Sequence, residues 1–444
     1  MKRDCKKKRY VYDPLYGIIY LPEFIWDVLD CPEIQRLREV RLCNINSLCL
    51  TGGANINRYE HAIGTYYLAK ECLDSRPPLH PVGEKEQKLF LLAALLHDVA
   101  SAAFGHSVEY IESKQGFEHE KAFEYVVLGE RGEAYEYKRA TLEPIFFGLP
   151  REIRSKIGEN DLETIDKLIA GKSRLGPLIN STMDLDNIDN VYRLGYHIGI
   201  VKSGEIPLKL AKSLYIENDA LILKKEAVPL VEEWHELRKK LYLLLLLNPE
   251  EFSAKCMLTE AIELAKTKSV HPFDWYDVDY KLLEKLSDIS SESAIVVSRL
   301  MKGDLYGCIA IFSTAKTDNY GFFTDTNSRK QLEDDLNKRI RSKFSPRFKS
   351  SLVATHPIID VNKTERQVRI QTDDGKIAQI GTSSNRLLIA VFFKNVDLNM
   401  YRICEISSDV MSGIRREIHT YLSNFLGDPN LGEVDLYGEV QSVR

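Results

Sequence analysis

Apolar residues recur at three- and four-residue spacing through most of the first 300 residues of this chain. That period places them along one face of an α-helix. A chain with many such helices in succession folds into a mainly α body, because each helix must bury its apolar face against its neighbours. The segments with this pattern are 24–29, 32–42, 59–73, 84–99, 117–128, 161–169, 184–194, 229–247 and 250–266.

The pattern changes near residue 303. Short segments rich in β-branched and aromatic residues follow, separated by polar turns such as Asp373-Asp374-Gly375, and this alternation is typical of strands. The strand-like segments are 306–313, 351–361, 367–371 and 387–393, and helical patterns lie at 328–343 and 408–425. We therefore predict a mainly α protein, with a helical core over residues 1–302 and a smaller C-terminal α+β domain over residues 303–444.

Composition and charge narrow the class of protein. The formal net charge of −5 argues against a surface built as a whole to hold nucleic acid. The longest apolar runs, 89–96 and 241–247, are too short to span a bilayer, which takes about 20 residues. The 8 cysteines form no Cys-x-x-Cys pair, so we expect reduced thiols in a reducing compartment. These features together predict a cytoplasmic protein with no membrane partner.

One pair of adjacent residues carries a strong chemical signal. His97-Asp98 follows directly on the apolar helical run 89–96. Adjacent residues lie about 100° apart around a helix, so both side chains can point into one cavity at its end. An ionised carboxylate buried there is costly unless a cation pairs with it. The pair therefore indicates a bound divalent metal ion.

Two further residues are candidate ligands of the same ion. His61 lies on the helical segment that follows a glycine-rich turn, and Asp186 lies in the acidic stretch 183–190. Two imidazoles and two carboxylates suit a single Mn, Fe, Zn or Mg ion, with room for water and a substrate oxygen. The acidic stretch also has a structural interpretation, in which Asp184 is a helix N-cap and Asp189 an ion-pair partner.

The order His61 … His97-Asp98 … Asp186 resembles the signature of HD-domain metal-dependent phosphohydrolases. Over residues 11–270 the chain more closely resembles the deoxynucleotide triphosphohydrolase branch of that superfamily. The order and spacing of several short matches carry the resemblance. These matches are Asp13-Pro14-Leu15-Tyr16-Gly17, Gln35-Arg36-Leu37-Arg38, Asn57-Arg58-Tyr59-Glu60-His61, Leu96-His97-Asp98, Ala103-Phe104-Gly105-His106, and Arg193 with Tyr196-His197-Ile198-Gly199-Ile200.

The resemblance implies roles for residues outside the metal site. His106 and Glu109 match a general acid–base pair, and their spacing of three places both on one helix face. His119 matches a further active-site histidine that touches phosphate. Arg58 and Arg238 match arginines that neutralise phosphate charge through paired donors.

The sequence departs from the family pattern where the nucleoside would be recognised. Ser101 stands in place of a second histidine, and Asn187 in place of a lysine that follows the metal-binding aspartate. Asn190 and Leu194 replace a tyrosine and an aspartate that contact the sugar. We expect Ser101, Asn187 and Asn190 to face the substrate. Changed hydrogen-bonding groups in a pocket alter which substrate it accepts.

The leading hypothesis is hydrolysis of a (deoxy)nucleoside triphosphate to nucleoside and tripolyphosphate. An alternative that uses the same metal centre is a monophosphate phosphatase or a single-strand nuclease, which salt-sensitive nucleic-acid binding would favour. A second alternative is a catalytically weak module that only senses nucleotides. The resemblance also implies a homo-oligomer, and it leaves an allosteric nucleotide open.

Overall fold

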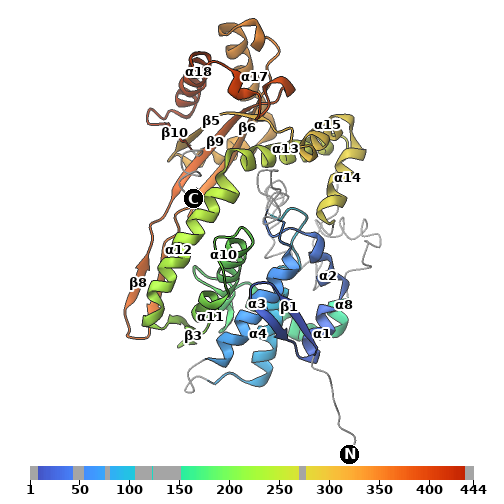
Figure 1. Ribbon diagram of the computed structural model, residues 1–444, viewed down its shortest axis with the longest axis vertical. Coiled ribbons are helices and arrows are strands. Elements are labelled where there is room, and N and C mark those ends of the chain that lie inside the picture. The colour runs from blue at the N-terminus through green and yellow to red at the C-terminus, as the bar shows by residue number, and fades with distance from the viewer. Residues whose placement is uncertain are drawn as a thin grey trace, which may run out of the picture.

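The computed structural model describes residues 9–43, 55–75, 81–105, 123, 152–269 and 277–435. It shows a mainly α protein, in which a helical body carries a smaller α+β region at one end (Figure 1). The expected fold class is therefore confirmed. Within these residues, no helix is both long enough and apolar enough to cross a membrane. The helix expected over 117–128 lies outside the described residues, apart from Phe123.

Four helices of the body surround the predicted site. They are α3 (Arg58–Asp74), α4 (Glu84–Leu96), α10 (Leu185–His197) and α12 (Val228–Tyr242). Helix α3 packs against both α4 and α10, and α10 packs against α12. The other helices of the body among the described residues are α1 (Glu23–Leu29), α2 (Pro32–Gln35), α8 (Glu152–Lys156), α9 (Glu159–Ile169), α11 (Glu205–Ala211), α13 (Pro249–Lys266), α14 (Asp279–Ile289) and α15 (Ser291–Met301).

Side-chain caps fix where two of these helices begin. Asn57 accepts a hydrogen bond from the backbone N–H of Glu60 at 2.9 Å, which starts α3. Asp184 accepts one from the backbone N–H of Asn187 at 2.7 Å, which starts α10. The structural role suggested for Asp184 is therefore confirmed. Its cap places Asp186 in the first turn of α10, at the positive end of the helix dipole.

The helical part also contains two strand pairs that the sequence pattern did not predict. Strands β1 (Tyr10–Asp13) and β2 (Gly17–Tyr20) pair antiparallel, as do β3 (Leu214–Glu217) and β4 (Ala220–Leu223). Each strand has four residues, which is too short for a period of two to stand out. The helix expected over 32–42 is also shorter than predicted, because α2 passes into a 3-10 turn over Arg36–Glu39.

The C-terminal region is built on a four-stranded antiparallel sheet in the order β10-β5-β9-β6. Its central strand β9 is buried on both faces, because alternate residues join two different cores. One face packs against α17 (Thr326–Lys343) and α18 (Ser408–Leu426), and the other against α13. The elements of this region are β5 (Gly307–Thr314), α16 (Tyr320–Thr324), α17, β6 (Val353–Val361), β9 (Asn385–Phe393), α18 and β10 (Gly432–Glu433).

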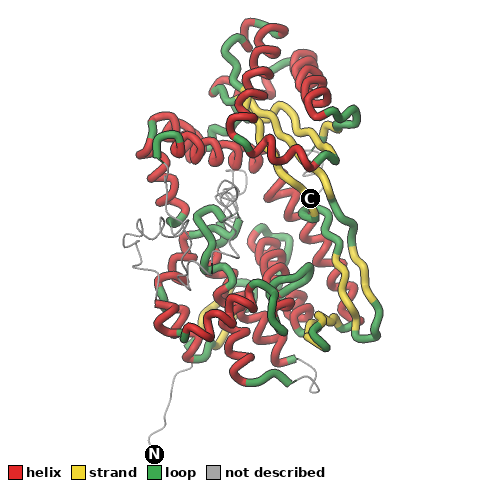
Figure 2. Tube along the Cα trace, turned by 180° about the vertical axis from the view of Figure 1, so that it is seen from behind, coloured by secondary structure: helices red, strands yellow, loops and turns green. Residues whose placement is uncertain are grey.

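The segment between β6 and β9, residues 362–384, extends back over the helical body, and we call it the arm. It contains β7 (Val368–Thr372) and β8 (Ile377–Ile380), which pair antiparallel. Strand β7 also pairs in parallel with β4 of the helical part, and β8 packs against α12. Figures 1 and 2 show the arm running along α12 from the sheet toward the body. Residues on both sides of the proposed domain boundary therefore share one sheet.

Strand β6 places His356 in the contact between the C-terminal sheet and α13. The residue is 6% exposed, and its ring lies edge-on to Phe252 with 5.9 Å between the ring centroids. Burial lowers the pKa of His356 to about 3, and the positive charges of Arg329 and Lys255 contribute to that shift. The imidazole is therefore neutral in the folded protein at pH values where it is protonated in the unfolded chain.

This difference predicts how stability depends on pH. The unfolded chain binds a proton on His356 below about pH 6.5, whereas the folded protein does so only near pH 3, so stability falls as the pH falls below 6.5. Between pH 6.5 and 5, wild type should lose about 1.5 kcal/mol more unfolding free energy than His356→Gln. Urea unfolding of both proteins at the two pH values measures this. Equal losses in the two proteins would contradict the assignment.

Candidate metal centre

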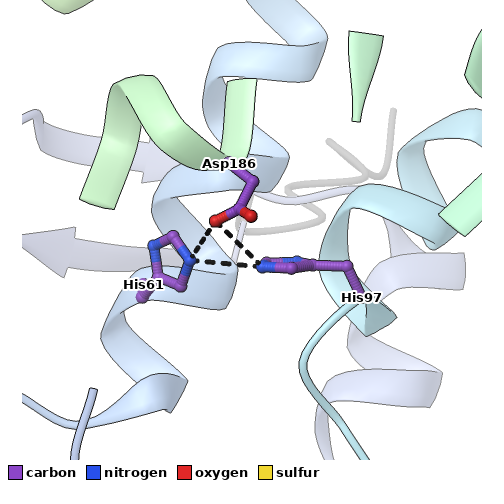
Figure 3. Close-up of side chains that lie close together, drawn as sticks. All are labelled: His61, His97 and Asp186. Atoms are coloured by element: carbon purple, nitrogen blue, oxygen red, sulfur yellow. Dashed lines mark hydrogen bonds and ion pairs between the residues drawn. The ribbon is translucent and has the colours of Figure 1, made fainter. Parts of the chain in front are cut away.

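Three of the predicted ligands come together where α3, α4 and α10 meet (Figure 3). His61 lies in the first turn of α3, His97 caps the C-terminus of α4, and Asp186 lies in the first turn of α10. The Nε2 atom of His61 lies 2.8 Å from Asp186 Oδ1 and 3.2 Å from His97 Nε2. All three donor atoms lie within 4.8 Å of one another. This cluster is compatible with a divalent metal site.

The second ring nitrogen of each histidine is held by an acceptor outside the cluster. His61 Nδ1 lies 2.7 Å from Asp189 Oδ2, and His97 Nδ1 lies 2.9 Å from the backbone oxygen of Ala94. With an ion bound, each ring would therefore donate its hydrogen through Nδ1 and turn the lone pair of Nε2 toward the ion. Two lone pairs and a carboxylate at this spacing repel one another unless a cation lies among them. The donor set therefore fits a metal ion.

The charges around His61 show the same preference for a cation. Burial by itself would lower the pKa of the His61 imidazole. Its hydrogen bonds to Asp186 and Asp189, together with the negative charge of both carboxylates, instead raise the pKa to about 10. The site therefore attracts positive charge strongly, which is the property that a metal site needs.

A buried ion-pair network fixes the carboxylate that holds His61. Arg193 donates from Nε and Nη2 to the two oxygens of Asp189, at 2.9 and 3.0 Å, and both residues are fully buried. The hydroxyl of Tyr16 donates to Asp189 Oδ1 at 2.8 Å. Arg193 also pairs with Asp13 at 3.0 Å and with Glu60. Asp189 is therefore an ion-pair partner, as one interpretation proposed, and it also orients a predicted metal ligand, which the sequence analysis missed.

Asp98, the fourth predicted ligand, lies close to the cluster but is bound by an arginine. Its Oδ2 atom is 3.9 Å from His61 Nε2 and 3.8 Å from His97 Nε2. Arg58 Nη1 lies 2.7 Å from both Asp98 oxygens, and Ser101 donates to Oδ1 at 3.0 Å. Burial would raise the pKa of Asp98, but Arg58 and the two histidines hold it well below its usual range. Asp98 is therefore an ionised carboxylate at the edge of the centre.

The other predicted substrate-binding residues lie around α10 and α12. Asn187 donates to the Asp184 carboxylate at 2.9 and 3.0 Å. Its backbone oxygen accepts a hydrogen bond from Trp234 Nε1 of α12 at 3.2 Å, and its Oδ1 accepts one from Arg366 Nη1 at 2.8 Å. Asn190 is half-buried on α10. Arg238 is buried on α12, with its guanidinium 4.0 Å from the ring centroid of Tyr242.

The three predicted catalytic residues, His106, Glu109 and His119, lie outside the described residues. Their roles stay predictions from the resemblance. The described part of the centre therefore contains the predicted metal ligands, together with Arg58, Ser101, Asn187, Asn190 and Arg238.

The hydrogen bond between His61 and Asp189 predicts a change in metal affinity. Asp189→Asn keeps the shape of the side chain but removes the negative charge that fixes Nδ1–H of His61. Loss of such a partner lowers metal affinity by about 10- to 100-fold. Competition with a fluorescent chelator measures the affinity, and Tyr16→Phe, which removes one contact to Asp189 but no charge, should change it less. Equal affinities for wild type and Asp189→Asn would contradict this role.

Comparison with known proteins places this geometry in a family. Residues 58–191 match the model of the HD domain. An uncharacterised protein of Bacillus subtilis is 25% identical over 256 residues, which are 57% of this chain and 55% of that protein. The deoxynucleoside triphosphate triphosphohydrolase SAMHD1 homologue of Dictyostelium discoideum is 23% identical over 313 residues, which are 66% of this chain and 57% of that protein. The chain thus spans little more than half the length of these two relatives.

A solved structure extends the comparison to the fold. A phosphohydrolase of Bacteroides thetaiotaomicron superimposes on 87% of this chain and on 100% of its own, with a TM-score of 0.62 and 16% sequence identity. That similarity shows a shared fold that extends beyond the HD domain. The matched span 58–191 contains all four predicted ligands, three of which converge in the structure. The chain therefore contains an HD domain over residues 58–191, and the similarity to the Dictyostelium relative supports the HD phosphohydrolase superfamily.

Proposed function

We propose that this chain is a metal-dependent phosphohydrolase that cleaves a nucleoside triphosphate, most simply a deoxynucleoside triphosphate, to nucleoside and tripolyphosphate. The observation that carries the proposal is the convergence of His61, His97 and Asp186, with their donor atoms within 4.8 Å of one another. The name of the Dictyostelium relative, a deoxynucleoside triphosphate triphosphohydrolase, supports the choice of substrate. We propose Mn, Fe, Zn or Mg as the ion, because the donors are nitrogen and oxygen.

The residues around the centre suit hydrolysis at phosphorus. An ion held by His61, His97 and Asp186, with Asp98 in reach, would polarise a phosphate oxygen and make a bound water more acidic. With the ion in place of a proton on Nε2, the two imidazoles would be neutral donors whose Nδ1 hydrogens are fixed by their acceptors. Arg58 brings a positive charge to the edge of the centre, where it balances Asp98 and can also face phosphate. The charges of the centre therefore suit a negatively charged phosphate group.

The proposal also covers the compartment in which the protein lies and its oligomeric state. We propose a cytoplasmic protein, because its cysteines suit a reducing compartment, and a homo-oligomer, because the resemblance implies one. Light scattering of the purified chain, with and without nucleotide, measures its mass in solution. A monomer under both conditions would contradict the oligomer.

A substrate panel tests the proposed reaction. The full chain, loaded with Mn²⁺, is incubated with the eight common ribo- and deoxynucleoside triphosphates, with nucleoside monophosphates and with a single-stranded oligonucleotide. We expect nucleoside and tripolyphosphate from at least one triphosphate, and no cleavage of the other two classes. Cleavage of only a monophosphate or the oligonucleotide would contradict the proposed substrate. No turnover of any compound, despite bound metal, would contradict the enzyme itself and favour a sensing module.

A further inference from the structure

The turn that starts helix α10 holds the predicted ligand Asp186 between residues that are bonded to one another. Asp184, which is 1% exposed, accepts hydrogen bonds from the backbone N–H groups of Ser181 at 2.8 Å and Asn187 at 2.7 Å. The side-chain amide of Asn187 donates to the same carboxylate at 2.9 and 3.0 Å. Residues 181–187 therefore form one hydrogen-bonded turn, and the place of the Asp186 carboxylate depends on how firmly this turn is closed.

Arg366 of the arm bridges the two ends of this turn. Its Nη1 atom donates to Asn187 Oδ1 at 2.8 Å, and its Nη2 atom donates to the backbone oxygen of Ser181 at 3.0 Å. These acceptors lie three residues before and three residues after Asp184, so one planar guanidinium spans the whole cap. The bond to Oδ1 also fixes the orientation of the Asn187 amide, with its NH2 group toward Asp184.

The charges within the turn give this contact a further effect. Asp184 and Asp186 are two carboxylates within one turn of the chain, and Asp184 is buried, so the two repel each other. The positive end of the α10 dipole stabilises both. The charge of Arg366 adds to this, because it polarises the Asn187 amide that donates to Asp184. Arg366 therefore stabilises the turn in the form that keeps both carboxylates ionised.

The arm is fixed to the helical body on both sides of Arg366. Just before it, the backbone oxygen of Lys363 accepts a hydrogen bond from Arg238 of α12, and Glu365 pairs with Lys239 of α12 at 2.5 Å. Just after it, β7 pairs in parallel with β4. A side chain on an element held in this way can keep its partners in one geometry.

We propose that Arg366 is a positioning residue of the metal centre, which clamps the first turn of α10 from the C-terminal region and so holds the Asp186 carboxylate in place. Asp186 Oδ1 lies 2.8 Å from His61 Nε2 and 3.6 Å from His97 Nε2. Outer partners of this kind set the geometry of direct ligands. Asn187, which accepts from Arg366 and donates to the cap, belongs to the same clamp. The inference rests on the metal centre of the proposed function and gives the C-terminal region a part in it.

Amide hydrogen exchange of the metal-free full chain tests the clamp without metal or substrate. The probes are the backbone N–H groups of Ser181 and Asn187, because both donate to Asp184. In Arg366→Ala they should exchange about tenfold faster than in wild type, the effect of losing a hydrogen bond to a charged group. The matched control is Arg369→Ala, an exposed arginine of β7 on the same arm, whose exchange should stay within about twofold of wild type. Equal exchange in wild type and Arg366→Ala would overturn the clamp.

Metal affinity tests what the clamp does for the centre. In competition with a fluorescent chelator, Arg366→Ala should bind Mn²⁺ about tenfold more weakly than wild type, at the lower end of the loss for an outer partner. Arg366→Lys keeps the charge but has no planar fork to reach both acceptors, so it should recover part of the affinity. Circular dichroism shows whether each variant is folded. Faster exchange with unchanged Mn²⁺ affinity would overturn the positioning role.

The outcomes separate this inference from the proposed function. If wild type hydrolyses no nucleotide but Arg366→Ala still exchanges faster and binds Mn²⁺ more weakly, the positioning role stands and the proposed function fails. If wild type hydrolyses nucleotides but Arg366→Ala matches Arg369→Ala in both measurements, the proposed function stands and the positioning role is wrong.

Kinetics at saturating metal distinguish positioning from direct contact with the substrate. On the best substrate of the panel, Arg366→Ala should lower kcat and keep KM within about twofold of wild type. A rise in KM with an unchanged kcat would make Arg366 a substrate contact and overturn the positioning role.

Discussion

Asp186→Asn is expected to lose its bound metal and more than about 100-fold of its hydrolytic activity while it stays folded. Asp186 provides the carboxylate oxygen that lies 2.8 Å from His61 Nε2 and 3.6 Å from His97 Nε2. An asparagine keeps the size of the side chain but cannot balance the charge of a divalent cation. Loss of an outer partner typically costs about 10- to 100-fold, so loss of a direct ligand should cost more.

The measurement combines metal content with activity. Mass spectrometry of the metals in each purified protein is compared with its rate on the best substrate of the panel. Asp288→Asn is the matched control, because Asp288 is an exposed aspartate on α14, away from the centre. It should keep wild-type metal content and rate. A fully metallated and fully active Asp186→Asn would remove Asp186 from the metal site.

Gly64→Ala is expected to destabilise the protein by about 3 kcal/mol, although alanine favours helices by about 1 kcal/mol over glycine. Gly64 lies on α3, where it passes the Asp189–Arg193 ion pair. A Cβ atom there would lie 2.1 Å from both Arg193 Nη2 and Asp189 Oδ1. These two groups are buried and bonded to each other, so the new methyl must separate charges that cannot reach water. His61, which Asp189 holds, should move with them and weaken metal binding.

A second glycine provides the control for this effect. Gly321 lies on α16, and a Cβ atom there would meet nothing within 4 Å. Gly321→Ala should therefore leave stability unchanged or raise it by at most about 1 kcal/mol. Urea unfolding of the two variants and wild type measures the difference. If Gly64→Ala were as stable as Gly321→Ala, the packing of α3 against the ion pair would be wrong.

Most of the helical body could be predicted from the sequence, because apolar periodicity reports which face of a helix is buried. The expected segment 59–73 is α3 (Arg58–Asp74), and 250–266 is α13 (Pro249–Lys266). Strand β9 was also predicted, since burial on both faces leaves a continuous apolar run. The short hairpins β1–β2 and β3–β4 were not, because four residues carry too little pattern and their pairing depends on tertiary contacts.

In the candidate site too, residues marked by local sequence motifs could be predicted, whereas contacts from distant segments could not. His61, His97 and Asp186 were predicted together, because residue type and motif spacing mark metal ligands. The role of Asp189 has a partial signal, since Asp189 and Arg193 are four residues apart on one helix. Arg366 has no such signal. It reaches Asn187, a position where the family carries a lysine, from a region without a family motif, and only the fold of the arm brings it there.

The central claim is that the chain cleaves a nucleoside triphosphate to nucleoside and tripolyphosphate. Hydrolysis of a deoxynucleoside triphosphate in ¹⁸O-labelled water tests this claim most directly. Mass spectrometry of the products from the metal-loaded chain shows which phosphorus is attacked, because the oxygen of the attacking water stays on that phosphorus. Attack at the α-phosphorus predicts unlabelled nucleoside and tripolyphosphate that carries one ¹⁸O atom. Label in inorganic phosphate with release of a nucleoside diphosphate, or label in the nucleoside, would contradict the proposed reaction.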